Sequence, residues 1–275
     1  MKKTLAIIMA VLMIATALFA FASCKKPADN AAEKTDLEYI KANGKIVIGV
    51  TDYAPFDYEE GGEWVGFDAD MARLLGEEIG VDVEFVEIDW EEKIIELQSK
   101  KIDAIWNGMT VTDELAEAMD FSNPYAENCQ VIVYKNPEFN TVEALEGKKI
   151  AVESGSAGET AAIEEFGEEN VTGLPGQTKA LFEVQAGTSD AAVVDYSMAK
   201  SLCGSGDYAD LKFIEEVRIG EEQFAVGVRQ GSELVGIINT LFADTLENGK
   251  MTELQEKYGA QEDGSNSIAL IEAKG

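Results

Sequence analysis

The alternation of short β-branched runs with amphipathic segments limits the possible folds of this chain more than any other feature. KIVIGV, VDVEFVEI and IDAIWNG have the composition of strands. Between them, FDADMARLLGEEIG and WEEKIIELQSKK carry apolar residues at helical spacing, which in the second segment predicts that Ile94, Ile95 and Leu97 face inward. Strands and helices in this order predict a parallel sheet covered by helices.

The same rhythm restarts after residue 127. CQVIVYK, KKIAVES, SDAAVVD and FAVGVRQ are typical of strands, and TVEALEG, GETAAIEEFG, TKALFEVQAG and YSMAKSLCG of helices. A long helical pattern then runs to about Gly259, and residues 260–275 are expected to form a frayed C-terminal tail. We therefore predict an α/β fold with two lobes, each a mainly parallel sheet flanked by helices. Lobe 1 is expected to comprise residues 37–126 and 221–259, and lobe 2 residues 127–220.

The N-terminus has the pattern of an export signal. Two lysines precede an apolar run, Leu5 to Phe21, that is short for a membrane span, so residues 1–23 are predicted to be a signal peptide. The following FASC looks like a bacterial lipoprotein signal, in which Cys24 is lipidated and becomes the mature N-terminus. Ordinary secretory cleavage beside an incidental cysteine is the alternative. Residues 24–36 are polar and lack apolar periodicity, which predicts a flexible tether.

Charge and residue usage exclude several functions. Lys and Arg total 22 against 52 Asp and Glu, so a formal charge of −30 repels nucleic acid and anionic lipid head groups. The chain contains no histidine, which excludes triad hydrolases and histidine-based zinc sites. Apart from Cys24, the cysteines are Cys129 and Cys203. Two cysteines make no disulfide framework, so buried free thiols are expected, although an exported protein also permits a disulfide between them.

The candidate site lies after the predicted strands, because ligands of open α/β sheets bind beyond the carboxyl ends of the strands. The residues there combine aromatic rings, small hydroxyl residues, backbone donors and a carboxylate, a set suited to a small polar molecule. They are Asp52, Tyr53, Phe56, Trp90, Asn107, Gly108, Thr110, Ser156, Ala157 and Asp195.

Several candidates also have a purely structural interpretation. One of Thr110 and Thr112 is expected to cap the following helix and the other to contact the ligand. Asp195 is either the N-cap of the next helix or, the interpretation we favour, the partner of a ligand ammonium. SGSAG is either a tight turn or an anion cradle, and the sequence does not separate the two. Trp90, beside charges at a strand end, is expected to stack on a ligand, whereas Trp106 is expected in the core.

From about Leu37 to Gly259 the chain resembles the periplasmic solute-binding proteins of the polar amino-acid type, which feed ATP-driven importers. The resemblance rests on GKIVIGV followed by APF, WVGFDADMARLLGEEIGVDVEFV, KIDAIWNGMTVT, MDFSNPY, LEGKKIAVESGS and DAAVVD. It implies two α/β lobes that close on a ligand about a two-strand hinge, which we place near residues 127–131 and 220–227.

The resemblance also implies roles for individual residues. Those matching Tyr53 and Trp90 stack on the ligand, those matching Gly108 and Thr110 with Ser156 meet its carboxylate, and the one matching Asp195 binds its α-ammonium. This chain departs from the family pattern at Leu115, where an arginine commonly pairs with the α-carboxylate, and at Ala157, often threonine or serine. No arginine follows a cleft strand, and the sequence does not place a lysine there. The ligand is therefore either a polar amino acid or a carboxylate-free amine or cation.

We expect a non-enzymatic, extracytoplasmic solute-binding component of an ABC importer, without cofactor or metal, that captures a polar amino acid or related amine. Its expected partners are the ligand, an ABC permease and, through lipid on Cys24, the outer face of the cell membrane. The protein is expected to be a monomer. Two other classes stay open: a sensory lipoprotein not linked to transport, and an enzyme like the dehydratases of this fold, with Glu153 and Asp195 as the available acid–base pair.

Overall fold

The computed structural model of the chain describes residues 34–271. The predicted signal peptide, Cys24 and most of the predicted tether lie outside the described residues. Among the helices of residues 34–271, none is long and apolar enough to cross a membrane. The first described helix, α2 (Asp36–Asn43), begins at a capping box in which Thr35 and Glu38 each bond the other's backbone N–H.

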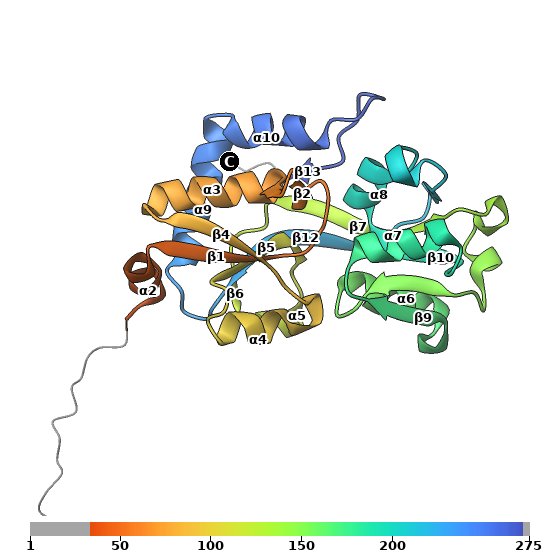
Figure 1. The fold of residues 1–275 in the computed structure, drawn as a ribbon, viewed down its shortest axis with the longest axis horizontal. Coiled ribbons are helices and arrows are strands. Elements are labelled where there is room, and N and C mark those ends of the chain that lie inside the picture. Colours follow the sequence, from red (N-terminus) through yellow and green to blue (C-terminus); the bar gives the residue numbers. More distant parts are fainter. Residues whose placement is uncertain (1–33, 272–275) are drawn as a thin grey trace, which may run out of the picture. The chain divides into compact units, whose positions relative to one another are not determined.

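One large mixed sheet runs through the structure (Figure 1). Its main path is β4 (Asp82–Glu87), β1 (Lys45–Val50), β5 (Ala104–Thr110), β12 (Ile219–Val228), β7 (Ala126–Tyr134), β10 (Ala191–Asp195), β8 (Ile150–Glu153) and β9 (Val171–Leu174). In the first parallel group, β1 pairs with β4 and β5; in the second parallel group, β8 pairs with β9 and β10. The antiparallel pair β12–β7 joins the two groups.

Helices flank both parallel groups. The first group carries α3 (Phe67–Ile79), α4 (Lys93–Gln98), α5 (Asp113–Ala116), α9 (Leu234–Glu247) and α10 (Lys250–Gly259). The second carries α6 (Ala157–Phe166), α7 (Gln177–Ala186) and α8 (Tyr196–Leu202). Short strands β6 (Asp120–Phe121), β11 (Lys212–Phe213) and β13 (Ala269–Leu270) pair with β12 or β7, while β2 (Tyr58–Glu60) and β3 (Glu63–Val65) form a separate hairpin.

Single-turn 3-10 helices occur between the larger elements. They are η1 (Trp90–Glu92), η2 (Pro137–Phe139), η3 (Glu143–Leu145), η4 (Glu168–Asn170) and η5 (Gly206–Tyr208). TVEALEG, predicted as a helix, is only the turn η3. The long C-terminal helical pattern is divided between α9 and α10 at Gly249, whose φ of 79° does not fit an α-helix.

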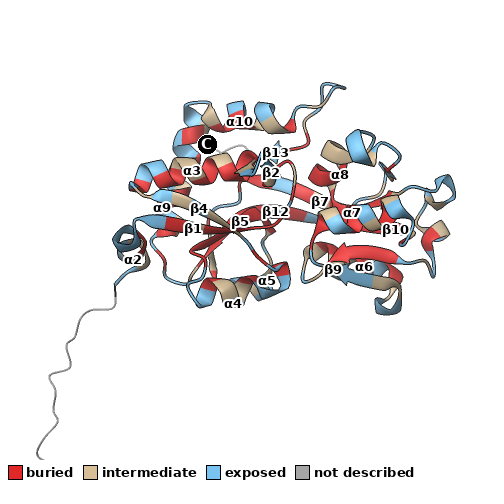
Figure 2. Ribbon diagram, in the orientation of Figure 1, coloured by how far each residue is buried: buried red, intermediate tan, exposed pale blue. Residues whose placement is uncertain are grey.

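Burial explains why these segments form a layered α/β fold. Strands β8 and β10 are buried along their whole length, and β5 along all but its last residue, as expected for strands covered on both faces. Helix α3 turns Met71, Leu75 and Ile79 toward the core and ends at Gly80 in the left-handed conformation. Figure 2 shows the buried residues concentrated in the sheet and the exposed ones on the outer faces of the helices. The predicted fold class is confirmed.

The predicted hinge segments lie in the two strands that join the parallel groups. In β12 and β7, Glu222 is opposite Asn128 and Gln223 is opposite Glu127. Hinge motion itself and the lobe boundaries stay predictions.

The inward face of α4 differs from the predicted one. Ile95 is 62% exposed, whereas Lys93 is 5% and Leu97 1% exposed. Residues 93 and 97 are four apart and share one side of the helix, while residue 95 lies about 200° around the axis from residue 93. The prediction for Ile95 was therefore wrong, and a lysine faces the interior instead.

The C-terminal segment, as far as residue 271, is not the predicted frayed tail. Ile268 is 1% exposed, and β13 pairs with β7 through Ala269 opposite Glu127. This contact could not be predicted from the sequence, because the segment is mostly polar and its short apolar run pairs with a strand from much earlier in the chain. Cys129 and Cys203 are free thiols, as predicted, although both are half-buried rather than buried.

Candidate functional site

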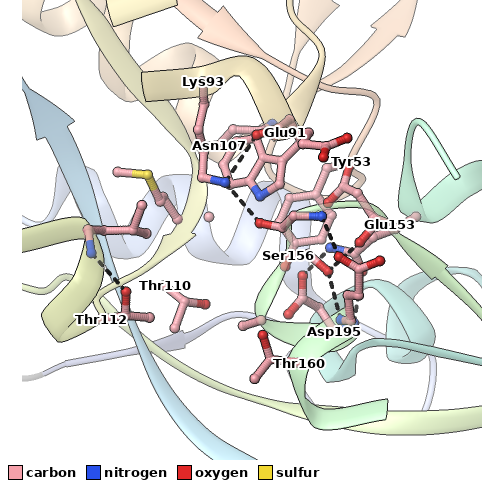
Figure 3. Close-up of a pocket in the computed structure, with 18 of the residues that line it drawn as sticks. Tyr53, Glu91, Lys93, Asn107, Thr110, Thr112, Glu153, Ser156, Thr160 and Asp195 are labelled. Atoms are coloured by element: carbon pink, nitrogen blue, oxygen red, sulfur yellow. Dashed lines mark hydrogen bonds between the residues drawn. The ribbon is translucent and has the colours of Figure 1, made fainter. Parts of the chain in front are cut away.

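A cavity of about 300 Å³ takes its lining from both parallel groups (Figure 3). This volume is at the lower end of the ~300–1,000 Å³ range of small-molecule sites. The lining comes from the loop after β1, from the end of β5 and the start of α5, from η1 and α4, and from β7. The ends of β8 and β10 and the first turns of α6 and α7 complete it. Nine of the eleven predicted site residues line it: Tyr53, Trp90, Asn107, Gly108, Thr110, Leu115, Ser156, Ala157 and Asp195.

Asp52 and Phe56 are not among the lining residues. Phe56 is 1% exposed and stacks on the Tyr53 ring with centroids 5.2 Å apart, so it belongs to the core behind the cavity wall. Asp52 has an exposed side chain, and its carbonyl accepts a 2.8 Å hydrogen bond from the Thr178 hydroxyl of α7. The sequence pattern did not distinguish these positions because all three residues follow the same strand.

The cavity wall formed by the end of β5 is held by buried hydrogen bonds. The Gly108 N–H donates to Asp68 Oδ2 at 2.8 Å, and the Asn107 amide bonds to Thr51 and to Asp57. Gly108 has a φ of 55°, and a Cβ there would lie 2.4 Å from the Tyr53 ring, so glycine is required. The Gly108 N–H is thus committed to Asp68, and burial raises the pKa of that carboxyl to about 7.

Thr110 and Thr112 divide the two expected roles. Thr112 is the N-cap of α5, and its hydroxyl accepts a hydrogen bond from the Leu115 N–H at 3.2 Å. Thr110 lines the cavity, and its hydroxyl donates to Glu222 at 3.1 Å. Capping by Thr112 is confirmed, and ligand contact by Thr110 stays a prediction.

Asp195 is buried among amide donors at the end of β10. Its carboxylate accepts hydrogen bonds from Asn128 at 2.5 Å, from Gln130 at 2.7 Å and from Gln177. Although it occupies the N-cap position of α8, its side chain makes no capping bond. Burial, followed by the charge of Glu222, raises the pKa of Asp195 to about 7. The purely structural role as a cap is therefore excluded.

Glu222, which the sequence analysis missed, belongs to the same network. It comes from β12, accepts hydrogen bonds from Thr110, Asn128 and Gln130, and has a pKa raised by burial. The signal available in the sequence was the polar triplet Glu221–Gln223 at the start of an apolar strand. Its amide partners come from β7, so the network spans the pair of strands that joins the two parallel groups.

Lys93 supplies the positive charge that the sequence analysis did not place. Its ammonium donates to the Trp90 carbonyl at 3.0 Å and to the Gly155 carbonyl at 2.9 Å, and it lies 5.0 Å from the Trp90 ring centroid. Burial lowers the pKa of Lys93, and the surrounding carboxylates, Glu153 foremost, counteract part of that effect. Of the described residues that line the cavity, Lys93 is the one base.

The SGSAG stretch forms a turn and the start of a helix. Gly155 has a φ of 69°, and Ser156 caps α6, accepting from the Glu159 N–H at 3.1 Å and donating to the Glu153 carbonyl at 2.7 Å. The Gly155 N–H already donates to the Glu159 carboxylate at 2.8 Å. One donor of the predicted anion cradle is thus occupied by the chain's own carboxylate.

The aromatic candidates form part of the wall. Tyr53 is 1% exposed, and its hydroxyl shares a 2.7 Å hydrogen bond with Ser197 of α8. Trp90, 7% exposed, lines the cavity beside Lys93. Trp106, by contrast, is fully buried, as predicted.

Glu153 is the remaining buried carboxylate of the cavity. It is 3% exposed, and its Oε1 has no hydrogen-bond partner among the described residues. Burial, followed by the Asp195 charge, raises the pKa of Glu153 to about 8, although Lys93 acts in the opposite direction. The site therefore offers one ammonium and several carboxylates to a small polar ligand.

Comparison with known proteins reveals consistent similarities. The model of the family described as bacterial extracellular solute-binding proteins, family 3, matches residues 46–261. The chain is 29% identical to the arginine-binding extracellular protein ArtP of Bacillus subtilis (strain 168) over 224 residues, covering 78% of the chain and 86% of that protein. A mutant of ArgBP from T. maritima is similar with a TM-score of 0.75 and 31% identity, covering 82% of the chain and 99% of that structure. The ancestral amino acid-binding protein AncCDT-1, a precursor of cyclohexadienyl dehydratase, has a TM-score of 0.73 and 31% identity at the same two coverages, 82% and 99%.

Proposed function

We propose a function for this chain, which belongs to family 3 of the bacterial extracellular solute-binding proteins. It captures a polar amino acid by closure of its two lobes and presents it to an ABC importer. A solute-binding role outside the cytoplasm follows from the family. To this role we add three proposals: how the two ends of the amino acid are recognised, that the lobes close on it, and that a lipid anchors the protein to the membrane.

The observation that carries this proposal is the presence of opposite buried charges in one cavity. Lys93 comes from the first parallel group and Asp195 from the second, and both line the cavity. A zwitterionic amino acid offers a carboxylate and an ammonium, so each end has a partner of opposite charge. In Figure 3, Lys93 enters the group of drawn residues from above and Asp195 lies below it.

Lys93 takes the role that the family commonly gives to an arginine at the position of Leu115. An ammonium has three N–H donors, and two of those of Lys93 are used on the Trp90 and Gly155 carbonyls. One donor is left for a ligand carboxylate, and the Thr110 hydroxyl lies on the same lining. Leu115 contributes an apolar, half-buried surface to the cavity.

Hydrogen bonds between the two parallel groups support closure as the mode of capture. Lys93 donates to Gly155, Tyr53 bonds to Ser197, and Thr178 donates to the Asp52 carbonyl. Each bond joins a residue after a strand of the first group to a residue of the second. Opening about β7 and β12 would break all three bonds and give the ligand access.

The cellular setting follows the sequence features. We place the protein at the outer face of the cell membrane, anchored by lipid on Cys24 and acting as a monomer beside its permease. We assign it no enzymatic activity, because AncCDT-1, the similar protein that is a precursor of a dehydratase, is an amino acid-binding protein.

A second candidate function is the binding of an amine or other cation without a carboxylate. The carboxylates of Glu91, Glu114, Glu153, Glu159 and Asp195 line the cavity against the single ammonium of Lys93. This excess of negative charge favours a cationic ligand. The buried position of Lys93 favours a ligand that also carries a carboxylate.

Thermal unfolding of the ligand-stripped protein distinguishes the two candidates. The panel pairs amino acids with their decarboxylated analogues: L-arginine with agmatine, and L-histidine with histamine. At 100 times the dissociation constant, a ligand stabilises the folded state by about 2.7 kcal/mol. We expect the amino acids to raise the melting temperature more than the amines do. Stabilisation by the amines alone contradicts the proposed function and supports the second candidate.

Lys93→Met tests the carboxylate anchor directly. Loss of a charge-assisted hydrogen bond of about 1.5–3 kcal/mol predicts amino-acid binding weaker by about tenfold to a hundredfold. Agmatine binding is expected to change much less, because agmatine has no carboxylate. Lys41→Met, on the exposed surface of α2, is the matched control. Equal losses for arginine and agmatine would mean that Lys93 acts only by holding the lobes together.

A further inference from the structure

Glu153 differs from Asp195, the other buried carboxylate of the cavity, because its Oε1 has no hydrogen-bond partner in residues 34–271, although hydrogen bonding to Gln177 and Thr51 acts to lower the pKa of the carboxyl group. It is the last residue of β8 and is 3% exposed, and its Oε1 accepts no hydrogen bond from any described residue. Asp195, in the same cavity, accepts hydrogen bonds from three amide side chains. A buried carboxylate without a partner is costly, which is why such groups in native proteins call for an explanation.

Lys93 does not supply that partner. No salt bridge within 4.0 Å joins Glu153 to a base in residues 34–271, and the Lys93 ammonium is engaged by two backbone carbonyls. The backbone of Glu153 is fixed by parallel pairing with β9, opposite Leu174, and by the Ser156 hydroxyl on its carbonyl. On the side of α7, the neighbour of Oε1 is Gly176, where a Cβ would lie 3.8 Å away. The backbone of Glu153 is thus fixed at the cavity that its side chain lines.

The charges that line the cavity indicate which kind of ligand group would lie beside Glu153. The α-carboxylate and α-ammonium of a zwitterion match Lys93 and Asp195 and leave Glu153 unmatched. Figure 3 shows Glu153 on the same side of the cavity as Asp195 and Tyr53. A further positive group on the ligand, carried by its side chain, would supply the missing donor and charge together.

We propose that Glu153 is a specificity-determining residue whose carboxylate binds a positively charged side-chain group of the ligand. The cleft therefore prefers cationic amino acids to neutral ones of the same size. This inference rests on the proposed function, because it takes the two ends of the amino acid as bound by Lys93 and Asp195. The raised pKa of Glu153 is consistent with it, since a desolvated carboxyl group without a partner retains its proton until a cation arrives.

The test compares L-arginine with L-citrulline, which has nearly the same shape and a neutral ureido group. Calorimetry on the ligand-stripped full-length protein is expected to show arginine bound at least about tenfold more tightly, the loss expected when a buried charge is left without its partner. In Glu153→Gln the preference is expected to fall to about one, with citrulline binding retained. Glu164→Gln is the matched control, because it removes one negative charge from the exposed face of α6 and is expected to keep the preference.

The outcomes distinguish failure of the role proposed for Glu153 from failure of the proposed function. Equal affinity of the wild-type protein for arginine and citrulline overturns the role of Glu153 and leaves the proposed function standing; this comparison needs no variant. A preference that survives in Glu153→Gln, or that disappears equally in Glu164→Gln, also overturns it. If no amino acid of the panel binds at all, the proposed function fails and this inference fails with it.

Discussion

Glu153 is a buried carboxyl group whose charge, in the proposed binding mode, changes when a cationic ligand binds. Burial and the charge of Asp195 raise its pKa to about 8, while Lys93 lowers it. Among the groups that face it, Asp195 has a pKa of about 7, and burial lowers the pKa of Lys93. A bound cation favours the ionised form of Glu153 and lowers its pKa, so binding is expected to release a proton at pH values between this lowered pKa and about 8.

This linkage predicts a pH dependence for ligand preference. The ratio of arginine to citrulline affinity is expected to rise between about pH 6 and 8, by at most about tenfold per unit, and to level off above the Glu153 pKa of about 8. Both ligands share the α-ammonium and α-carboxylate, so the titrations of Asp195 and Lys93 largely cancel in the ratio. Calorimetry across this range measures it. A ratio that does not change with pH, or that rises equally in Glu153→Gln, contradicts the prediction.

Single residues of the site differed in how far the sequence could predict them. Tyr53, Thr110 and Asp195 were found because they lie at or just after the ends of strands, and strand ends meet at one edge of a sheet. Lys93 was missed because its position depends on how α4 turns against the sheet. Glu222 was missed because its partners come from a neighbouring strand that lies far away in the sequence.

At the scale of elements, α4 shows how the orientation of a helix decides the chemistry of the site. The helix has only six residues, and its sequence, KIIELQ, permits more than one apolar face. The observed face buries Leu97 against Ile102 and Met109 in one hydrophobic cluster and turns Lys93 toward the cavity. Too few turns are present for periodicity alone to select the face.

The orientation of α4 has a measurable consequence for stability. Leu97→Ala is expected to lower the free energy of unfolding by about 2–5 kcal/mol, because it leaves a cavity in a packed cluster. Ile95→Ala is expected to change it by no more than about 0.5 kcal/mol, since the side chain is 62% exposed. Urea unfolding of the two variants beside the wild type gives the comparison. Similar losses for both would indicate that Ile95 is buried, as the periodicity suggested.

At the scale of the whole molecule, segments distant in the sequence hold the strands that join the two parallel groups. Strand β13, near the end of the described residues, pairs with β7, and Leu270 lies opposite Ala126. Ile268 is buried in the cluster that includes residues of both groups, among them Val50 and Val194. The C-terminal segment therefore supports the junction at which the proposed closure occurs.

Ile268→Ala tests this support. We expect a loss of about 2–5 kcal/mol in the free energy of unfolding, the usual range for truncating a buried isoleucine. Glu262→Ala, an exposed position in the same segment, is the control and is expected to have almost no effect. Denaturant unfolding followed by circular dichroism measures both. If Ile268→Ala changes the free energy of unfolding as little as its control does, the segment is a tail that does not stabilise the fold.

The sequence by itself determined the strands, most helices, the presence of a cap at either Thr110 or Thr112 and the class of ligand site, because these depend on residues within a few positions of one another. Only the tertiary structure decided which charges share the cavity. Lys93 meets Gly155 across 62 positions of the chain, and Asn128 meets Glu222 across 94. The first pair forms when the two parallel groups pack and the second when β7 pairs with β12, and no local pattern specifies which side chains are then buried together. The position of the Lys93 ammonium at the cavity and the buried Glu153 Oε1 without a hydrogen-bond partner among the described residues are therefore properties of the folded chain.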